Sequence, residues 1–304
     1  MKLPFLKPVV PPHVFCVLSD GMTYASVRRD PPVGFAQSRH FAYPPNTLGS
    51  GASGTPLLTR EAVAEAVEAG RRLSEGRLSR ASVVFPDAWA RMLPIEFDTI
   101  PDSEPAVREM VQWKLKKLLP GITSELTVVF REMTAVGESK RLLVAAAPAD
   151  TLNSIEKSFE SVGVRVGTLA PASLLLFEGF TRRLSTLAKG DFALVHRSSG
   201  SLVFLVVRDG SPLFFRQRSS EHEKQDQEQE LRLSLSYYTE KLGGQGLAAV
   251  YSHDETPAEG ALSDRFQVPV ESLTGRLLGG DAAFDERIGA RPELLSAFAA
   301  ASAV

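Results

Sequence analysis

The chain has 304 residues, 43% of them hydrophobic, and its 34 lysines and arginines nearly balance its 36 aspartates and glutamates. This near-neutral charge gives no electrostatic basis for binding nucleic acid or an anionic membrane surface, and the length predicts two domains. The single cysteine, Cys16, excludes an internal disulfide, and no apolar run approaches the roughly 18 residues of a spanning helix, so a soluble cytoplasmic protein without direct membrane insertion is predicted.

The first predicted unit is a meander of three strands within residues 13–43. The runs HVFCVLSD, TYASVRRD and VGFAQSRHFAYP are rich in β-branched and aromatic residues. Asp20-Gly21 and Asp30-Pro31-Pro32 are the turn signals between them. Because the residues around Cys16 form an apolar strand, its thiol is predicted to be buried and structural.

A loop rich in glycine and serine follows at residues 49–54 and formally matches G-x-G-x-x-G. A dinucleotide site needs that motif directly between a strand and a helix, whereas prolines stand on both sides here, so a surface loop is the better interpretation. The next helix is predicted to follow the cap Thr59, with Glu61 in its first turn and Arg71-Arg72 near its end. Residues 80–85 then predict a buried strand that ends in a turn.

From the strand MLPIEFDTIP to about residue 165 the pattern changes. A helix begins at Ser103 and stops at Pro120-Gly121, two strands follow, and an amphipathic helix is predicted at Ala149–Val162. The first helix carries the basic triplet Lys114, Lys116 and Lys117. The triplet is most simply a solvated face, and a contact with an acidic partner is the alternative.

A second meander is predicted at residues 191–219, from the runs DFALVHRSSG, SLVFLVVRDG and SPLFFRQRS with an Asp209-Gly210 turn. The helix ELRLSLSYYTEKLGG and the strand LAAVYSHD follow. Four apolar residues of that helix share one face by their spacing: Leu231, Leu235, Tyr238 and Leu242. Two meanders, each followed by a helix and a returning strand, indicate a duplicated ribonuclease H-like unit. The tail predicts one more strand (FQVPVESL) and a short terminal helix (RPELLSAFAAASA).

Val195–Gly210 resembles the second-domain phosphate hairpin of the PilM family, the cytoplasmic actin-like proteins of type IV pilus assembly. Leu233–Tyr238 with its Gly-rich turn, and the tryptophan-bearing helix Met110–Pro120, are similar to family segments as well. The resemblance implies an α/β, actin-like (ribonuclease H-like) two-domain fold with an inserted FtsA-type 1C subdomain. The implied units are actin-like domain 1 (1A) at 1–95 and 165–187, the inserted subdomain at 96–164, and actin-like domain 2 (2A) at 188–304 with a reduced or absent 2B subdomain.

Actin-like ATPases hold magnesium and nucleotide with aspartates and glycines of two phosphate hairpins, and this chain departs from that pattern. The residues at the matching positions are Ser19, Asp20, Gly21, His196, Ser198, Ser199 and Ser252. Ser19 and His196 replace the two aspartates, Ser198 replaces a glycine, and residues 253–255 (HDE) replace consecutive glycines at the adenosine turn. We therefore expect a pseudo-ATPase without a cofactor, with binding of ATP and magnesium as the alternative.

No other chemistry is indicated. The five histidines show no metal-ligand spacing in the sequence and one cysteine cannot build a thiolate zinc site, so no metal site is predicted. His196 could lie near Asp20 across a cleft between the meanders, but an unpaired cleft histidine is usually passive in catalysis. We expect no catalytic residue.

By the resemblance, the chain is a non-catalytic scaffold in the inner-membrane assembly platform of a type IV pilus or a type II secretion system. It would be cytoplasmic and peripheral at the inner membrane through its partners, a PilN-like membrane protein and other platform components. In the family, the tail of that protein lies between the first domain and the inserted subdomain, which here implies the strand Arg80–Phe85 and the helix Val107–Leu118. The implied contact residues are Val83, Phe85, Trp113 and Leu115. An ATP-hydrolysing, kinase-like or filament-forming protein is the alternative, and the oligomeric state stays open.

Overall fold

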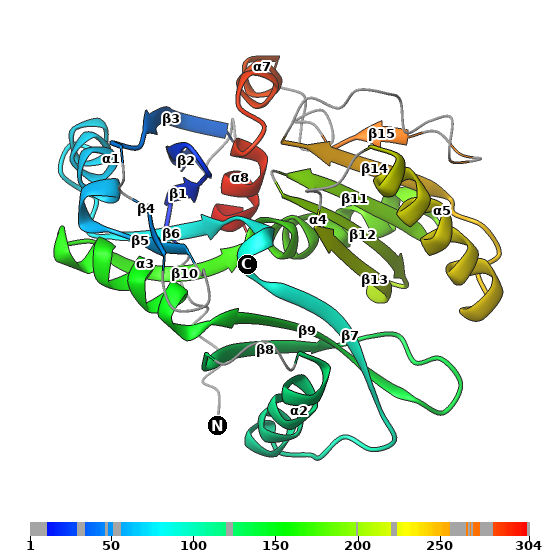
Figure 1. Ribbon diagram of the computed structural model, residues 1–304. Helices are drawn as coiled ribbons and strands as arrows, with labels where there is room; N and C mark the ends of the chain where they lie inside the picture. The colour runs from blue at the N-terminus through cyan, green and yellow to red at the C-terminus, as the bar shows by residue number, and fades with distance from the viewer. Residues whose placement is uncertain are drawn as a thin grey trace.

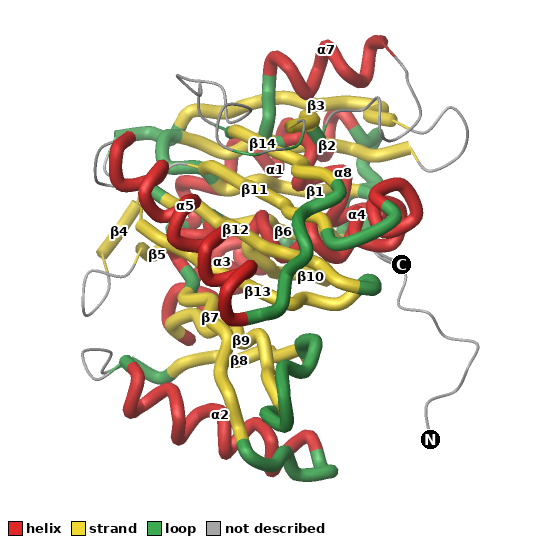
Figure 2. Tube along the Cα trace, turned by 90° about the vertical axis from the view of Figure 1, so that its right-hand side faces the viewer, coloured by secondary structure: helices red, strands yellow, loops and turns green. Residues whose placement is uncertain are grey.

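The computed structural model describes residues 11–28, 34–45, 48–50, 56–119, 124–198, 200–219, 224–255, 266, 268, 270–273 and 282–302. Two five-stranded sheets lie side by side, with helices between and around them (Figure 1). A three-stranded sheet with one helix projects from this body, as the turned view in Figure 2 also shows.

The first sheet is built on the N-terminal meander. In spatial order it contains β10 (Arg165–Pro171), β6 (Arg80–Phe85), β1 (His13–Val17), β2 (Gly21–Arg28) and β3 (Gly34–Ala42). The strands β1, β2 and β3 pair antiparallel, whereas β6 runs parallel to both β1 and β10. The predicted meander and the predicted strand at residues 80–85 are confirmed.

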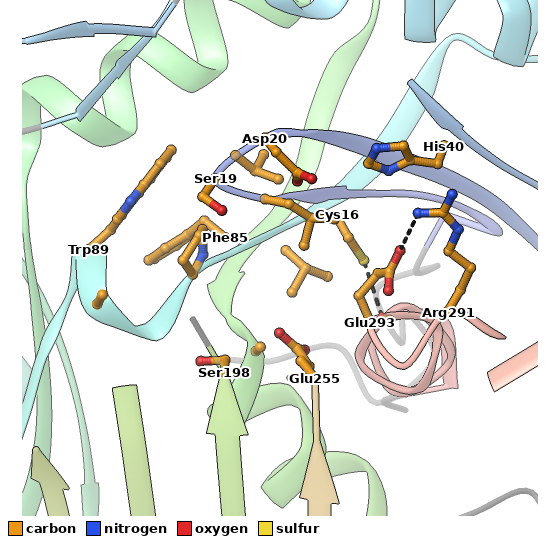
Figure 3. A pocket seen from close by; sticks show the side chains of 16 residues that line it. Cys16, Ser19, Asp20, His40, Phe85, Trp89, Ser198, Glu255, Arg291 and Glu293 are labelled. Atoms are coloured by element: carbon orange, nitrogen blue, oxygen red, sulfur yellow. Dashed lines mark hydrogen bonds and ion pairs between the residues drawn. The ribbon is translucent and has the colours of Figure 1, made fainter. Parts of the chain in front are cut away.

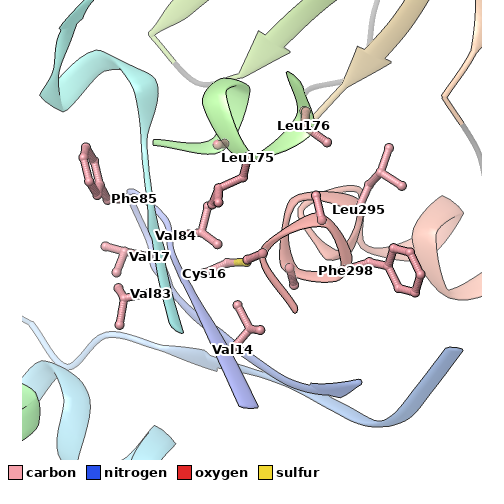
Figure 4. Close-up of a cluster of buried hydrophobic side chains, with 14 of the residues drawn as sticks. Val14, Cys16, Val17, Val83, Val84, Phe85, Leu175, Leu176, Leu295 and Phe298 are labelled. Atoms are coloured by element: carbon pink, nitrogen blue, oxygen red, sulfur yellow. The ribbon is translucent and has the colours of Figure 1, made fainter. Parts of the chain in front are cut away.

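Helices cover both faces of this sheet, which explains why β1 is buried at every position. Successive side chains of a strand point to opposite faces. Phe15 packs against Phe159 of α3 (Ala149–Ser161), with ring centroids 5.0 Å apart. The Cys16 thiol points the other way and donates to the backbone oxygen of Glu293, 3.4 Å away, just before α8 (Leu294–Ser302). Figure 4 shows this second face, and the prediction of a buried thiol is confirmed.

The remaining covering helices are α1 and α4. α1 (Arg60–Leu73) packs against β2 and α3, and the Thr59 side chain accepts a hydrogen bond from the backbone N–H of Ala62, as the predicted cap requires. α4 (Ala172–Ala188) contacts α8 and also β11 and β12 of the second sheet, so it lies between the two sheets. A short hairpin of β4 (Leu48–Ser50) and β5 (Pro56–Leu58) follows β3.

The second sheet repeats the plan of the first. In spatial order it contains β13 (Ser211–Ser219), β12 (Ser201–Arg208), β11 (Phe192–Ser198), β14 (Ala249–Asp254) and β15 (Val270–Ser272). In each sheet, three antiparallel strands form a meander. A parallel strand pairs with the first strand of the meander, and a second parallel strand pairs with that one. Asp209 and Gly210 both have positive φ, 51° and 75°, as a two-residue hairpin turn requires. The predicted duplication is therefore present.

Helix α5 (Lys224–Lys241) covers the outer face of the second sheet and begins earlier than expected. The prediction placed the helix after a polar linker, at Glu230, but the polar residues from Lys224 onward are already helical. The apolar face is as predicted, since Leu231, Tyr238 and Leu242 are buried against the sheet and Leu235 packs at its margin. The error arose because a run of polar residues at the start of a helix leaves no apolar period to detect.

The three-stranded sheet has the order β7-β9-β8, all antiparallel, from β7 (Arg91–Phe97), β8 (Leu126–Glu132) and β9 (Lys140–Pro148). Helix α2 (Glu104–Leu118) covers one face and shares a small core with it. The predicted helix at 149–162 is present as α3, which packs with α1, β5 and β10 in the core of the first sheet. The chain ends with α7 (Ala282–Ala290) and α8, and no described helix is long and apolar enough to cross a bilayer.

Candidate functional site

A cavity of about 390 Å³ opens where β1, β6 and β11 end (Figure 3). The first meander contributes its β1–β2 turn, and the second contributes the end of β11. The short helix η2 (Asp87–Trp89) after β6 and the segment before α8 close the sides. The polar and charged side chains that line this cavity include Ser19, Asp20, His40, Ser198, Glu255, Arg291 and Glu293.

The β1–β2 turn is tight, and this tightness accounts for Gly21. The backbone N–H of Leu18 donates to the oxygen of Gly21 at 2.9 Å. A Cβ at position 21 would lie 2.3 Å from the backbone oxygen of Phe41 on β3, and would also meet the ring of His40. Glycine is therefore required by the close approach of β3, rather than by a ligand in the cavity.

A buried polar cluster lies behind the cavity and links both halves of the molecule. His196 on β11 lies beside His253 on β14, because the two strands pair in parallel with these residues in register. Their rings are stacked at 5.3 Å with an interplanar angle of 4°. His196 Nε2 lies 3.4 Å from Oδ2 of Asp87, in η2, and 3.9 Å from Oε1 of Glu255, just after β14. His196, His253 and Asp87 are at most 4% exposed.

Burial dominates the electrostatics of this cluster. It raises the pKa of Asp87, although the imidazole of His196 and two hydrogen bonds from Ser173 favour the charged carboxylate. It also raises the pKa of Glu255 to about 7, with His196 opposing the shift and the nearby carboxylates adding to it. The pKa of His253 is lowered well below its usual value by burial and by His196. The cluster therefore holds several ionisable groups in a poorly hydrated space.

Carboxylates also dominate the cavity itself. Three carboxylates line it, those of Asp20, Glu255 and Glu293, whereas Arg291 is the one lysine or arginine among the described residues of the lining. Glu293 is held by a hydrogen bond of 2.6 Å from the hydroxyl of Thr23. A surface of this charge attracts cations and repels polyphosphate. The lining carboxylates therefore disfavour the close approach of a nucleotide's phosphate groups.

The structure gathers only part of the sequence-predicted nucleotide set. Ser19, Asp20 and Ser198 line the cavity, and Gly21 adjoins Asp20 in the turn. His196 is buried behind the cavity, where its acidic neighbours are Asp87 and Glu255 rather than Asp20. Ser252 pairs with Val195 within the sheet and is not among the residues that line the cavity, whereas Ser199 lies outside the described residues.

The residues predicted to contact a partner are not brought together on one surface. Val83 and Phe85 are buried in the core of the first sheet, and Leu115 is buried in the small core under α2. Trp113 is 56% exposed on α2, where the ammonium of Lys117 lies 3.6 Å from its ring centroid. Strand β6 is paired on both edges, with β10 and β1, so it cannot accept an added strand.

Sequence reasoning missed Asp87, and it noted His253 and Glu255 only as replacements for glycines. The one available signal for Asp87 was a carboxylate directly after a buried strand, in VVFPD. Nothing local indicates that His196 and His253, 57 residues apart, become neighbours. The sequence showed no metal-ligand spacing, yet the fold brings ligand atoms of His196, His253 and Glu255 within 4.8 Å of one another.

No protein-family model matches the chain, and no curated protein matches it by sequence. Among solved structures, a chain of a PilM-PilN type IV pilus biogenesis complex superposes with a TM-score of 0.75 at 16% identity, covering 97% of this chain and 98% of that one. The cytoplasmic domain of EpsL, an inner-membrane component of the type II secretion system of Vibrio cholerae, gives 0.51 at 13% identity over 94% and 93%.

A Bacteroides thetaiotaomicron protein with an actin-like ATPase fold gives a TM-score of 0.50 at 9% identity, covering 90% of this chain and 94% of that chain. At these identities the likeness establishes the fold. The predicted actin-like α/β fold, and the predicted resemblance to the fold of PilM, are confirmed.

Proposed function

We propose that this chain is an actin-like platform protein of a type IV pilus or a type II secretion system, and that it binds the cytoplasmic tail of a PilN-like membrane protein without hydrolysing ATP. The observation that carries the proposal is the superposition on a chain of the PilM-PilN complex along nearly the whole length of both chains. In this role the chain is cytoplasmic and reaches the inner membrane through its partners. The inserted subdomain expected at 96–164 is here assigned to the three-stranded sheet with α2, from Arg91 to Pro148, because β7 already belongs to that sheet and α3 packs in the core of the first sheet.

The cavity supports the absence of ATP hydrolysis. Actin-like hydrolysis needs carboxylates that hold magnesium and glycines that admit phosphates. Here the corresponding hairpins carry Ser19 and His196, and the ring of His196 lies next to the carboxylates of Asp87 and Glu255. The lining carboxylates oppose a triphosphate. The chain would therefore work by recognition rather than by turnover.

The free edge of β8 is the surface that we assign to the tail. Strand β8 pairs only with β9 in the described part of the chain, and the backbone oxygen of Val128 on it also accepts a hydrogen bond from the guanidinium of Arg108 on α2. We assign the other outward N–H and C=O groups of this edge to pairing with an extended peptide. Val129 on β8 is 55% exposed and stands opposite Ala145, which packs into the core of the first sheet. Cross-strand partners point to the same face, so Val129 faces the side where the three-stranded sheet meets the main body.

This assignment revises the surface implied by the family resemblance. The strand β6 is enclosed, whereas the edge strand β8 is open and its end is fixed to the main body by an ion pair of Arg131 with Glu178 on α4. Arg131 also lies over the ring of Phe177, 4.9 Å from the centroid. An extended peptide could thus contact the three-stranded sheet and the first domain together.

The proposal is tested by calorimetry of the full chain with a peptide from the cytoplasmic tail of the PilN-like protein of the same organism. We expect binding that Val129→Asp weakens by roughly 10-fold or more, because it places a charge where an apolar side chain would be buried. Trp113→Ala tests whether α2 contributes. Leu233→Asp is the matched control, since Leu233 is 45% exposed but lies on α5 of the other half. Equal binding by the Val129→Asp variant would exclude this surface.

The rival reading, an ATP-binding or ATP-hydrolysing protein, is tested separately. The purified full chain is titrated with ATP and magnesium at up to millimolar concentration. We expect neither heat of binding nor a change in melting temperature. Magnesium-dependent binding at micromolar concentration would overturn the pseudo-ATPase part of the proposal while leaving tail binding to its own test.

A further inference from the structure

The cluster behind the cavity directs several unpaired acceptor atoms at one another. Nε2 of His196, Nε2 of His253 and Oδ2 of Asp87 are buried and make no hydrogen bond with any described residue. An acceptor left without a partner in a buried space costs free energy, so an arrangement of this kind calls for a positively charged occupant.

Backbone hydrogen bonds fix which nitrogen of each ring is free. Nδ1 of His196 lies 3.3 Å from the backbone oxygen of His253, and a carbonyl can only accept, so Nδ1 carries the hydrogen. His253 in turn donates to the backbone at Pro292, and because its Nε2 is unpartnered, its Nδ1 makes that bond. In both rings the bond at Nδ1 leaves Nε2 as the nitrogen that is available to ligate a metal. This is how histidines that bind metals are oriented by their outer hydrogen bonds.

We propose that His196, His253 and Glu255, with Asp87 as a fourth ligand, bind a divalent transition metal of the zinc class. Two imidazole nitrogens and two carboxylate oxygens are a donor set that such cations accept, and together the carboxylates supply two negative charges. A charge of two on the cation balances these two negative charges. The inference rests on this geometry and does not depend on the proposed function.

The ligand atoms lie farther apart than they would around a bound ion. The ligand atoms of His196, His253 and Glu255 lie within 4.8 Å of one another. Tetrahedral zinc, with bonds of about 2.0–2.2 Å, spaces its ligands at roughly 3.3 Å, so binding would draw the ligand atoms together by at most about 1.5 Å. Glu255 also lines the cavity, which gives the ion a path from solvent.

The role that follows is structural. Asp87 belongs to the first half of the molecule, whereas the other three ligands belong to the second sheet and its end. A cation held by four protein ligands has no open position for substrate. It would instead fasten the two halves to each other across the base of the cavity.

The test uses the full chain, with any affinity tag removed, after dialysis against a chelator. Zinc is titrated by calorimetry, and cobalt is titrated while its visible absorption is recorded. We expect one ion per chain, cobalt bands typical of four-coordinate nitrogen and oxygen ligands, and a rise in melting temperature with zinc. His253→Gln should weaken zinc by roughly 100-fold or more, beyond the ~10–100-fold effect of an outer partner.

His40→Gln is the matched control, because His40 lines the same cavity but lies outside the cluster and bonds Thr23 at 3.1 Å. If His253→Gln does not fold, histidine side-chain NMR of the unaltered chain decides: zinc should shift two of the five histidines. Failure to bind one ion per chain would overturn the proposal. Full binding by a folded His253→Gln variant would overturn it as well.

Discussion

Gln217 of β13 and Asp87 of η2 are joined directly: Nε2 of Gln217 donates to the backbone oxygen of Asp87 at 2.7 Å. The same amide donates to the oxygen of Ala90 at 3.1 Å and accepts from the N–H of Met92 at 2.8 Å. One side chain of the second sheet thus satisfies the backbone between β6 and β7. The loop that carries Asp87 is held in place from the other half of the molecule.

Gln217→Ala should therefore lower the free energy of unfolding by about 1–3 kcal/mol, because it leaves partly buried backbone groups without partners. Urea unfolding followed by circular dichroism measures the change. Gln37→Ala on the exposed side of β3 is the control and should change little. Equal stability of the two variants would show that water replaces the Gln217 bonds at no cost.

Gly21→Ala should destabilise the chain through the contact of its Cβ with the backbone oxygen of Phe41, at 2.3 Å before relaxation. We expect a loss of about 1–3 kcal/mol, since backbone cannot move aside as a flexible side chain can. Gly49→Ala is the matched control, because its Cβ would meet Leu57 only at an ordinary distance of 3.6 Å. A neutral Gly21→Ala variant would mean that β3 shifts easily and that the glycine serves another purpose.

Tyr238 anchors α5 to the start of β11. Its hydroxyl lies 2.8 Å from Oδ2 of Asp191, which also receives two hydrogen bonds from the guanidinium of Arg208. Tyr238→Phe should cost about 1–3 kcal/mol because it removes a hydrogen bond to a charged group. Tyr237→Phe, on the adjacent residue that is 40% exposed, should be nearly neutral in the same thermal or urea unfolding measurement. Similar losses in both would contradict this role.

His13 should make stability depend on pH. Burial and the charge of Arg77 lower the pKa of its imidazole, whose nitrogen lies 3.0 Å from the hydroxyl of Tyr24. Between the lowered pKa and about 6.5, the unfolded chain binds more protons than the folded chain, so the free energy of unfolding rises with pH. The contribution of His13 to stability is therefore lost as the pH falls below about 6.5. In His13→Gln the decline between pH 7 and pH 5 should be shallower. Parallel stability curves would exclude the contribution of His13.

Much of the fold was predictable because its signals are local. Alternating or continuous apolar runs, the Asp20-Gly21 and Asp209-Gly210 turns, and the cap Thr59 each depend on a few neighbouring residues. The polar start of α5 was missed because no apolar residue marks it. The candidate site was only half predicted, since the substitutions in the phosphate hairpins were visible but their surroundings were not.

The sequence by itself determined the two repeated meanders and, through its resemblance to a known family, the actin-like plan. Only the tertiary structure decided that His196 meets His253, Asp87 and Glu255, that β6 is enclosed and that the edge of β8 is open. Strand type follows from the local pattern of side chains. Strand order and the contacts between distant residues follow from how the whole chain packs, because burial and pairing are settled only when every element has found its neighbours.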